Sequence, residues 1–396
     1  MLTLQSDKMF RLYLTTQAVD VNMNKSLINY RLEKDCTFFV LLRYALGISQ
    51  ELPDAISDDE WNTLYKLSQE QTLSGIVYAA IQRLPEPLLP NEMLLFQWFS
   101  NARHIAKTNQ KVTEEAVRWT EWFAQQGHKS CILKGQANAR LYPDPTTRTS
   151  GDVDIWVEGG EKKVTELLEK AGKIDETTTF STYDIHLMPK ERDGVDIEVH
   201  FLPSAGNSNP KTTPYLLNYL DKELATLTLC PEGFYMPTMK FCLAMQLAHI
   251  QSHFLTEGIS LRQLMDYYML LCHSTEQERN EIREHLKPMG LYNMATAVMW
   301  VLSEMLMLDE QQMLIPANKK RGTILLGGIM KGGNFGRYSP RWETGSFLRR
   351  NIVYAHDKMN MAMQFPEEVL WSEIGRWRSF FETIPERIQK RQWALR

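Results

Sequence analysis

The spacing of the apolar residues changes between residues 128 and 203, and this change decides which folds the chain can adopt. Outside this segment, apolar residues recur mostly with the helical period of about 3.6 residues. Inside it, they form short runs that are typical of strands. The predicted strands are Ser130–Leu133, Val153–Val157, Tyr183–Met188 and Val195–Phe201. We therefore expect an α+β fold, with a small mixed sheet embedded between N-terminal and C-terminal helical regions.

Turn and helix signals complete this central segment. The dipeptide Asp193-Gly194 predicts a hairpin turn between the last two strands. One short helix is expected over Gln136–Tyr142, and another over Glu161–Ala171, which ends at Gly172.

The flanking regions carry clear helix-end signals. Ser57 and Glu60 have the spacing of a capping box, and Gly127 ends a helix over 91–126 that no glycine or proline interrupts. Other helices are expected over Cys36–Leu46, Thr72–Leu84, Thr238–Phe254, Ser260–His273, Leu291–Leu308, Phe347–Met363 and Leu370–Arg396. The segment Pro316–Gly345 is rich in glycine, lysine and arginine, which predicts a loop.

These signals divide the chain into five expected regions. They are an N-terminal extension (1–34), a helical region (35–127), an α/β core (128–230), a helical bundle (231–315), and a loop with C-terminal helices (316–396).

Charge and cysteine usage exclude several classes of protein. The net charge of −4 gives no overall attraction to nucleic acid or to an anionic membrane. The five cysteines include no Cys-x-x-Cys pair, which argues against a zinc ribbon or a disulfide framework. No signal peptide or membrane-spanning run is present, so we expect a cytoplasmic protein without a membrane partner.

Two aspartates open the second predicted strand. Because side chains alternate along a strand, Asp152 and Asp154 project to one face, about 6–7 Å apart. Val153, Ile155 and Val157 project to the other face and can enter the core. Paired carboxylates of this kind can hold the divalent cations that phosphoryl-transfer sites use.

A neighbouring strand offers further ligands. Asp196, Glu198 and His200 share one face by the same alternation, so a third carboxylate can complete the cation site. Lys134 and Arg148 add positive charge for a triphosphate. The helix start after Gly135 offers backbone amides and the positive end of a helix dipole to a phosphate.

These motifs together resemble a known family. They are Leu133-Lys134-Gly135, then Arg148-Thr149-Ser150-Gly151-Asp152-Val153-Asp154, and then Ile197-Glu198-Val199-His200. The pattern is similar to the uncharacterised nucleotidyltransferases (family 5 type) of the DNA polymerase β-like superfamily, over residues 35–300.

The resemblance implies an activity and a set of site residues. A member of this superfamily moves a nucleoside monophosphate from a nucleoside triphosphate to a hydroxyl acceptor, with Mg²⁺ (or Mn²⁺), and releases pyrophosphate. Asp152 and Asp154 would be metal ligands, with Glu198 as the matching third carboxylate and Asp196 as the competing one. The implied nucleotide-binding residues are Lys134, Gly135, Arg148, Ser150 and Gly151. The acceptor, whether RNA, protein or a small molecule, is left open.

One departure keeps two alternatives open. The superfamily usually has Gly-Ser before the short helix, whereas this chain has Gly135-Gln136. A degenerate nucleotide- or RNA-binding module without turnover is therefore one alternative. Another is a toxin-like nucleotidyltransferase that modifies tRNA or protein, which Lys134 and the basic end of the chain (376–396) favour.

A downstream pair of histidines also matches the narrower family. His249 and His253 lie four residues apart, so they share one helix face. They could bind zinc, lie near the acceptor, or join Asp266 in a polar cluster beside the carboxylates.

Overall fold

The computed structural model describes residues 36–189, 194–339, 346–382 and 384. The expected extension 1–34, the turn residue Asp193 and most of the basic end of the chain lie outside these residues.

The described residues include a five-stranded mixed sheet flanked by helices, which confirms the predicted α+β class. Its strands are β1 (Ser130–Ile132), β2 (Val153–Val157), β3 (Thr179–Phe180), β4 (Asp184–Leu187) and β5 (Ile197–His200). Their order is β1-β2-β5-β4-β3, and only the neighbours β2 and β5 run parallel. A two-stranded sheet pairs β6 (Leu227–Leu229) with β7 (Tyr235–Pro237).

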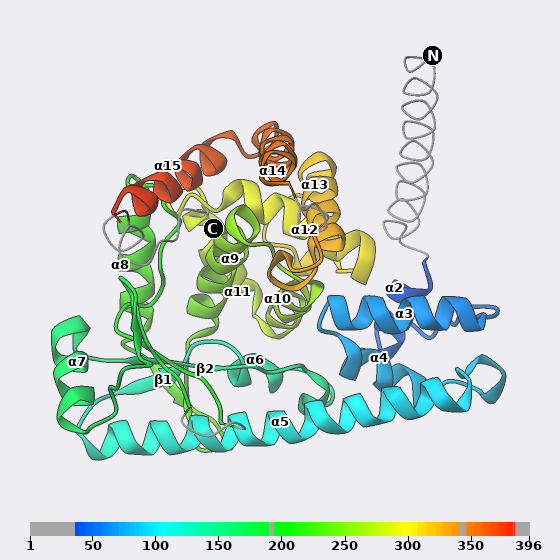
Figure 1. Ribbon diagram of the computed structural model, residues 1–396, viewed down its shortest axis with the longest axis horizontal. Helices are drawn as coiled ribbons and strands as arrows, with labels where there is room; N and C mark the ends of the chain where they lie inside the picture. The colour runs from blue at the N-terminus through cyan, green and yellow to red at the C-terminus, as the bar shows by residue number, and fades with distance from the viewer. Residues whose placement is uncertain (1–35, 190–193, 340–345, 383, 385–396) are drawn as a thin grey trace, which may run out of the picture.

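A long helix, α5 (Glu92–Gln125), joins the N-terminal helices to the sheet (Figure 1). Asn91 caps its first turn by accepting a hydrogen bond from Leu94 N. Its apolar stripe buries Trp98, Val112 and Phe123. The helices before it are α2 (Thr37–Ala45), α3 (Asp58–Glu70), α4 (Ser74–Ile81) and the 3₁₀ turn η1 (Glu86–Leu88).

Three helices lie within or directly after the central segment. They are α6 (Gln136–Ala139), α7 (Gly160–Lys170) and α8 (Thr213–Glu223), with a 3₁₀ turn η2 (Pro145–Thr147) before β2. The expected helix over Gln136–Tyr142 is shorter than predicted, because only turn contacts continue it beyond Ala139.

The C-terminal half adds seven helices among the described residues. They are α9 (Met239–Thr256), α10 (Leu261–His273), α11 (Glu276–His285), α12 (Tyr292–Leu306), α13 (Lys319–Gly332), α14 (Phe347–Ala362) and α15 (Pro366–Glu382), with 3₁₀ turns η3 (Glu310–Gln312) and η4 (Asn334–Gly336). Figure 1 shows α9–α13 gathered on the side of the molecule that lies away from α5.

The predicted loop over Pro316–Gly345 is wrong for residues 319–332, which form α13. The glycines of α13 allow the helix to pack closely against neighbouring side chains. A Cβ on Gly322 would lie 2.2 Å from Trp300 Cε3, and one on Gly328 would lie 2.8 Å from Phe254 Cε2. Tertiary packing therefore overrides the low helix propensity of glycine here.

None of the helices in the described ranges combines the length and the apolar character that crossing a lipid bilayer requires.

Candidate active site

The strand β2, which is hydrogen-bonded to β1 on one edge and to β5 on the other, carries a buried carboxylate. Its apolar residues Val153, Ile155 and Val157 are buried, as their alternation predicts. Asp154 is only 1% exposed, and its register partner on the parallel strand β5 is Glu198. The pairing of β2 with β5 therefore brings the two predicted carboxylates face to face.

Asp154, Glu198 and His200 form a compact cluster of possible metal ligands. One ligand atom from each lies within 4.8 Å of the others. His200 Nε2 is 3.2 Å from Asp154 Oδ1 and 3.7 Å from Glu198 Oε2. The second oxygen of Asp154, Oδ2, is buried and has no hydrogen-bond partner. Because buried polar atoms are normally paired, this oxygen indicates a place for a ligand.

Lys134, directly after β1, neutralises this cluster. Its Nζ lies 3.1 Å from Asp154 Oδ1. Burial opposes the charge of both groups, but their mutual attraction outweighs it. The pKa of Asp154 therefore lies well below its usual range, and the pKa of Lys134 lies above its own.

The pKa values of the other two members of the cluster, Glu198 and His200, are both raised, which favours their protonated forms. Burial, with Asp154 and Asp152 adding repulsion, raises the pKa of Glu198. Burial lowers the pKa of His200, but its hydrogen bonds to Asp154 and Glu198 raise it further, to about 9. His200 is thus a cation at neutral pH.

The two remaining aspartates have different surroundings. Asp152 precedes β2 and lines one polar cavity together with Asp154, Lys134 and Gly135. The side chain of Asp196 is 43% exposed, and its Oδ2 lies 3.9 Å from His186 Nε2. The structure therefore brings Glu198, rather than Asp196, to Asp154.

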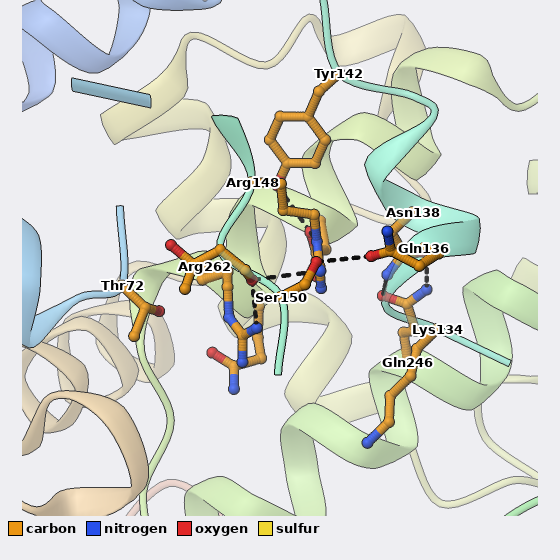
Figure 2. A network of polar contacts seen from close by, with 12 residues as sticks. Thr72, Lys134, Gln136, Asn138, Tyr142, Arg148, Ser150, Gln246 and Arg262 are labelled. Atoms are coloured by element: carbon orange, nitrogen blue, oxygen red, sulfur yellow. Dashed lines mark hydrogen bonds and ion pairs between the residues drawn. The ribbon is translucent and has the colours of Figure 1, made fainter. Parts of the chain in front are cut away.

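Arg148, predicted to bind a triphosphate, is committed to a buried ion pair. Its Nε and Nη2 donate to the two carboxylate oxygens of Asp266, at 2.8 and 2.7 Å. Tyr142 donates to the same carboxylate at 2.8 Å (Figure 2). These bonds fix the segment before β2 to α10, so Arg148 holds the site together in this structure.

Gln136 and Ser150 belong to a second buried network. The Nε2 of Gln136 donates to Asn109 O on α5 and to Thr113 Oγ1. Ser150 Oγ lies 2.7 Å from Gln136 Oε1 and is also within hydrogen-bond distance of Asn109 Oδ1 (Figure 2). Gln136, where the resemblance to the superfamily implies a serine, is therefore turned away from the cavity that Asp152 lines, and it holds α6 on α5.

The turn at Gly135 needs a glycine, because its φ is +61°. Its backbone lines the cavity beside Asp152. The helix α6 that follows has only four residues, fewer than the short helix predicted here, so its dipole contributes less to phosphate binding than expected.

The two histidines of α9 lie on the predicted shared face, with ring centres 4.2 Å apart. Only His249 lines the cavity, and burial lowers its pKa well below the usual value, with Lys134 and His253 adding repulsion. His253 Nδ1 lies 3.4 Å from Glu257, and its ring lies against Phe335. The candidate metal group in the described ranges contains neither histidine.

Sequence reasoning missed several cavity residues. Asn138 on α6 and Gln246 on α9 exchange two side-chain hydrogen bonds of 2.9 and 2.7 Å (Figure 2). Phe335 reaches the cavity from η4, in the segment predicted as a loop. Arg262, in the first turn of α10, also lines it. A signal for Arg262 existed, because a cation in the first turn of a helix, two residues after the N-cap serine, is unfavourable without a ligand.

The arrangement can bind a divalent cation and an anion side by side. Asp152, Asp154 and Glu198 offer carboxylate oxygens, which Mg²⁺ and Mn²⁺ prefer. Cationic side chains line the same cavity as Asp152 and Asp154, and Glu198 lies beside Asp154. This combination suits a phosphate ester that arrives with a metal ion.

Comparisons with known proteins agree with this chemistry. A family model described as "Uncharacterised nucleotidyltransferase" matches residues 57–307, a range that includes the cavity residues except Phe335. A crystal structure of an antigenic nucleotidyltransferase-like protein from Paracoccidioides brasiliensis is also similar, at 14% identity and a TM-score of 0.33. That match covers 50% of this chain and 94% of the other. No curated protein matches the sequence.

Proposed function

The chain belongs to the family of uncharacterised nucleotidyltransferases, and on that premise we propose that it transfers a nucleoside monophosphate from a nucleoside triphosphate to a hydroxyl acceptor. The acceptor oxygen bonds to the α-phosphorus, the bond to the oxygen bridging to the β-phosphate breaks, and pyrophosphate and the hydroxyl proton are released. The observation that supports this proposal is the buried, unpartnered Oδ2 of Asp154 beside Glu198, in one cavity with Asp152.

The donor set fits a divalent cation. Asp152, Asp154 and Glu198 would hold Mg²⁺ or Mn²⁺, and the unpaired Oδ2 of Asp154 is the kind of atom that a cation satisfies. When bound, the cation supplies positive charge to the phosphate oxygens and lowers the pKa of the acceptor hydroxyl.

The residues of the chain contribute by position and charge. Strand pairing on both edges of β2 fixes Asp154 against Glu198. The protonated His200 orients both carboxylates, and the Arg148–Asp266 pair holds the segment that presents Asp152. Such preorganisation is the main source of rate enhancement in phosphoryl transfer.

Transfer can be tested with the purified protein and each α-labelled nucleoside triphosphate, with Mg²⁺ or Mn²⁺ and with cellular RNA, protein and small molecules as acceptors. The destination of the label identifies the acceptor. We expect Asp154→Asn to reduce transfer by more than about 100-fold, because an essential metal ligand is lost. Asp196→Asn is the matched control and should keep wild-type transfer, since Asp196 faces His186. Wild-type transfer by folded Asp154→Asn protein would refute the assignment.

One observation favours a second candidate function, nucleotide binding without turnover. The Gln136 side chain lies in the buried network with Asn109 and Thr113, so no side-chain hydroxyl stands at the turn after Gly135. Mg²⁺-dependent binding of a nucleoside triphosphate, without pyrophosphate release in the presence of every acceptor fraction, would support this alternative.

A further inference from the structure

Three long cationic side chains line the cavity, and two of them are already neutralised. Lys134 pairs with Asp154, and Arg148 pairs with Asp266. Arg262 is the third, and no carboxylate of the described residues lies within ion-pair distance of it. Among the described residues, Arg262 is therefore the cation of this cavity that has no direct ion pair.

The position of Arg262 is electrostatically unfavourable. It is the second residue of α10, which begins after the Ser260 capping box, so it lies at the positive end of the helix. Burial disfavours its charge and the neighbouring Arg148 repels it, while Asp266 and Asp152 offset only part of this, so the pKa of Arg262 lies below its usual value. A cation that is retained where burial, a helix dipole and a like charge all oppose it indicates a site for an anion.

The guanidinium of Arg262 has hydrogen bonds to spare. Its Nη1 donates to Thr149 O at 2.8 Å, which anchors the side chain beside the segment that leads to Asp152. Its Nε is buried and has no partner. Figure 2 shows the Arg262 side chain beside Ser150 and apart from Lys134. Its remaining donors are therefore available to a ligand in the cavity.

The chemistry of the cavity restricts which anion this is. Asp152 and Asp154 line the same space, so a simple anion would be repelled. A polyphosphate that carries a divalent cation presents positive charge to the carboxylates and negative charge to an arginine. It is the ligand that satisfies both.

We propose that Arg262 binds the terminal phosphates of the nucleoside triphosphate, the part that leaves as pyrophosphate. This inference rests on the proposed function. Arg262 then matches the negative charge that develops on the leaving group, and its bidentate geometry sets the orientation of the polyphosphate.

Equilibrium binding to the full-length protein tests this inference without turnover. The probes are the nucleoside triphosphate that binds best of the four, its monophosphate, and inorganic tripolyphosphate, each with Mg²⁺ or Mn²⁺. We expect Arg262→Gln to weaken triphosphate and tripolyphosphate binding about tenfold or more, and monophosphate binding less than about twofold. Arg262→Lys should retain part of the affinity, because the charge remains although the geometry of the Thr149 bond is lost. Arg118→Gln, on the exposed side of α5, should change none of these constants.

The outcomes separate this inference from the proposed function. The inference would be overturned if Arg262→Gln weakened monophosphate and triphosphate binding equally. It would also be overturned if Arg262→Lys bound the triphosphate as weakly as Arg262→Gln. Either result would show that Arg262 serves to hold Thr149. Unchanged triphosphate binding by Arg262→Gln overturns it alone. A wild-type protein that binds no nucleoside triphosphate with either cation overturns both proposals. Where the monophosphate binds too weakly to measure, the tripolyphosphate constant decides. Thermal unfolding of each variant verifies that it is folded.

Discussion

Asp154 carries a negative charge that is almost fully removed from water, and two cations make this possible. Lys134 and His200 both approach its Oδ1 atom. An isolated buried carboxylate would be protonated instead, because burial penalises the charged form. The candidate site is therefore balanced internally before any ligand binds, and each partner of Asp154 contributes to the stability of the protein.

Removing Lys134 should destabilise the protein, because Asp154 loses one of its two cationic partners. We expect Lys134→Met to lower the free energy of unfolding of the metal-free protein by about 2 kcal/mol, because a buried charge loses its partner. Mn²⁺ should restore stability to this variant by more than it stabilises the wild type. Urea denaturation with and without Mn²⁺ measures both effects. Arg378→Met, which breaks an exposed pair with Glu382, is the control and should change stability by less than about 1 kcal/mol. Equal losses in the two variants would contradict the role of Lys134.

The Arg148–Asp266 pair should make stability depend on pH in the acidic range. Burial raises the pKa of Asp266, but Arg148 outweighs this, so the folded-state pKa lies below the usual carboxyl value of about 3.9. Its stabilisation is then fully present above the unfolded-state pKa and is lost as the pH falls through the folded-state pKa. We expect Asp266→Asn to cost about 3 kcal/mol at pH 7. The difference from the wild type should shrink as the pH falls below about 4, which urea denaturation at several pH values measures. A difference that grows on acidification would contradict this account.

Only part of this side-chain arrangement can be predicted from the sequence. Strand alternation places Asp154, Glu198 and His200 correctly, since a period of two needs no knowledge of the rest of the fold. The pairing of Arg148 with Asp266 joins residues 118 positions apart, and no local pattern encodes it. Long-range pairing also explains why the predicted phosphate-binding residues Lys134 and Arg148 have carboxylate partners in the structure. Arg262, which has no direct ion pair, was not predicted as a site residue.

At the scale of elements, local signals predict best where they do not compete with packing. The four strands and the long helix α5 lie close to their expected bounds, because their apolar periods are regular. Helix α11 was missed because it is mostly polar, although Thr275 and Glu278 have the spacing of a capping box. Helix α13 was predicted as a loop because its glycines suggest flexibility, whereas they serve close contact with α9 and α12.

Two glycines of α13 should respond oppositely to alanine. Gly322→Ala would place a methyl group against Trp300, so we expect a loss of about 2 kcal/mol in unfolding free energy. Gly327→Ala meets nothing within 4 Å, so it should stabilise the protein by about 0.5–1 kcal/mol through its better helix propensity. Urea denaturation of the two variants tests this directly. Stabilisation by both changes would show that α13 does not pack closely against Trp300.

At the scale of the whole molecule, one apolar core connects the sheet to the helices on both sides. The cluster runs from Phe38 in α2, through Ile155 in β2, to Val369 in α15. The five regions expected from the sequence remain a prediction, but such a core couples energetically the four that the described residues cover.

The described part of the chain should therefore unfold in one transition. We expect tryptophan fluorescence and far-ultraviolet circular dichroism to give the same urea midpoint, because Trp61, Trp156 and Trp300 report on three regions that share the core. Separate midpoints would show that residues 128–230 fold independently of their flanking helices.

Because β2 lies between β1 and β5, the position of Asp154 in the site is fixed, whereas its cationic neighbours can move. The carboxylate of Asp154 is attached to backbone that is bonded on both edges, whereas Lys134 and Arg262 reach the cavity on long, rotatable stems. The carboxylate is therefore held in place, whereas the cationic side chains around it can move aside. A metal ion that binds Asp154 competes with the ammonium group of Lys134. Its occupancy therefore depends on the ionic strength of the solution as well as on the carboxylates of the site.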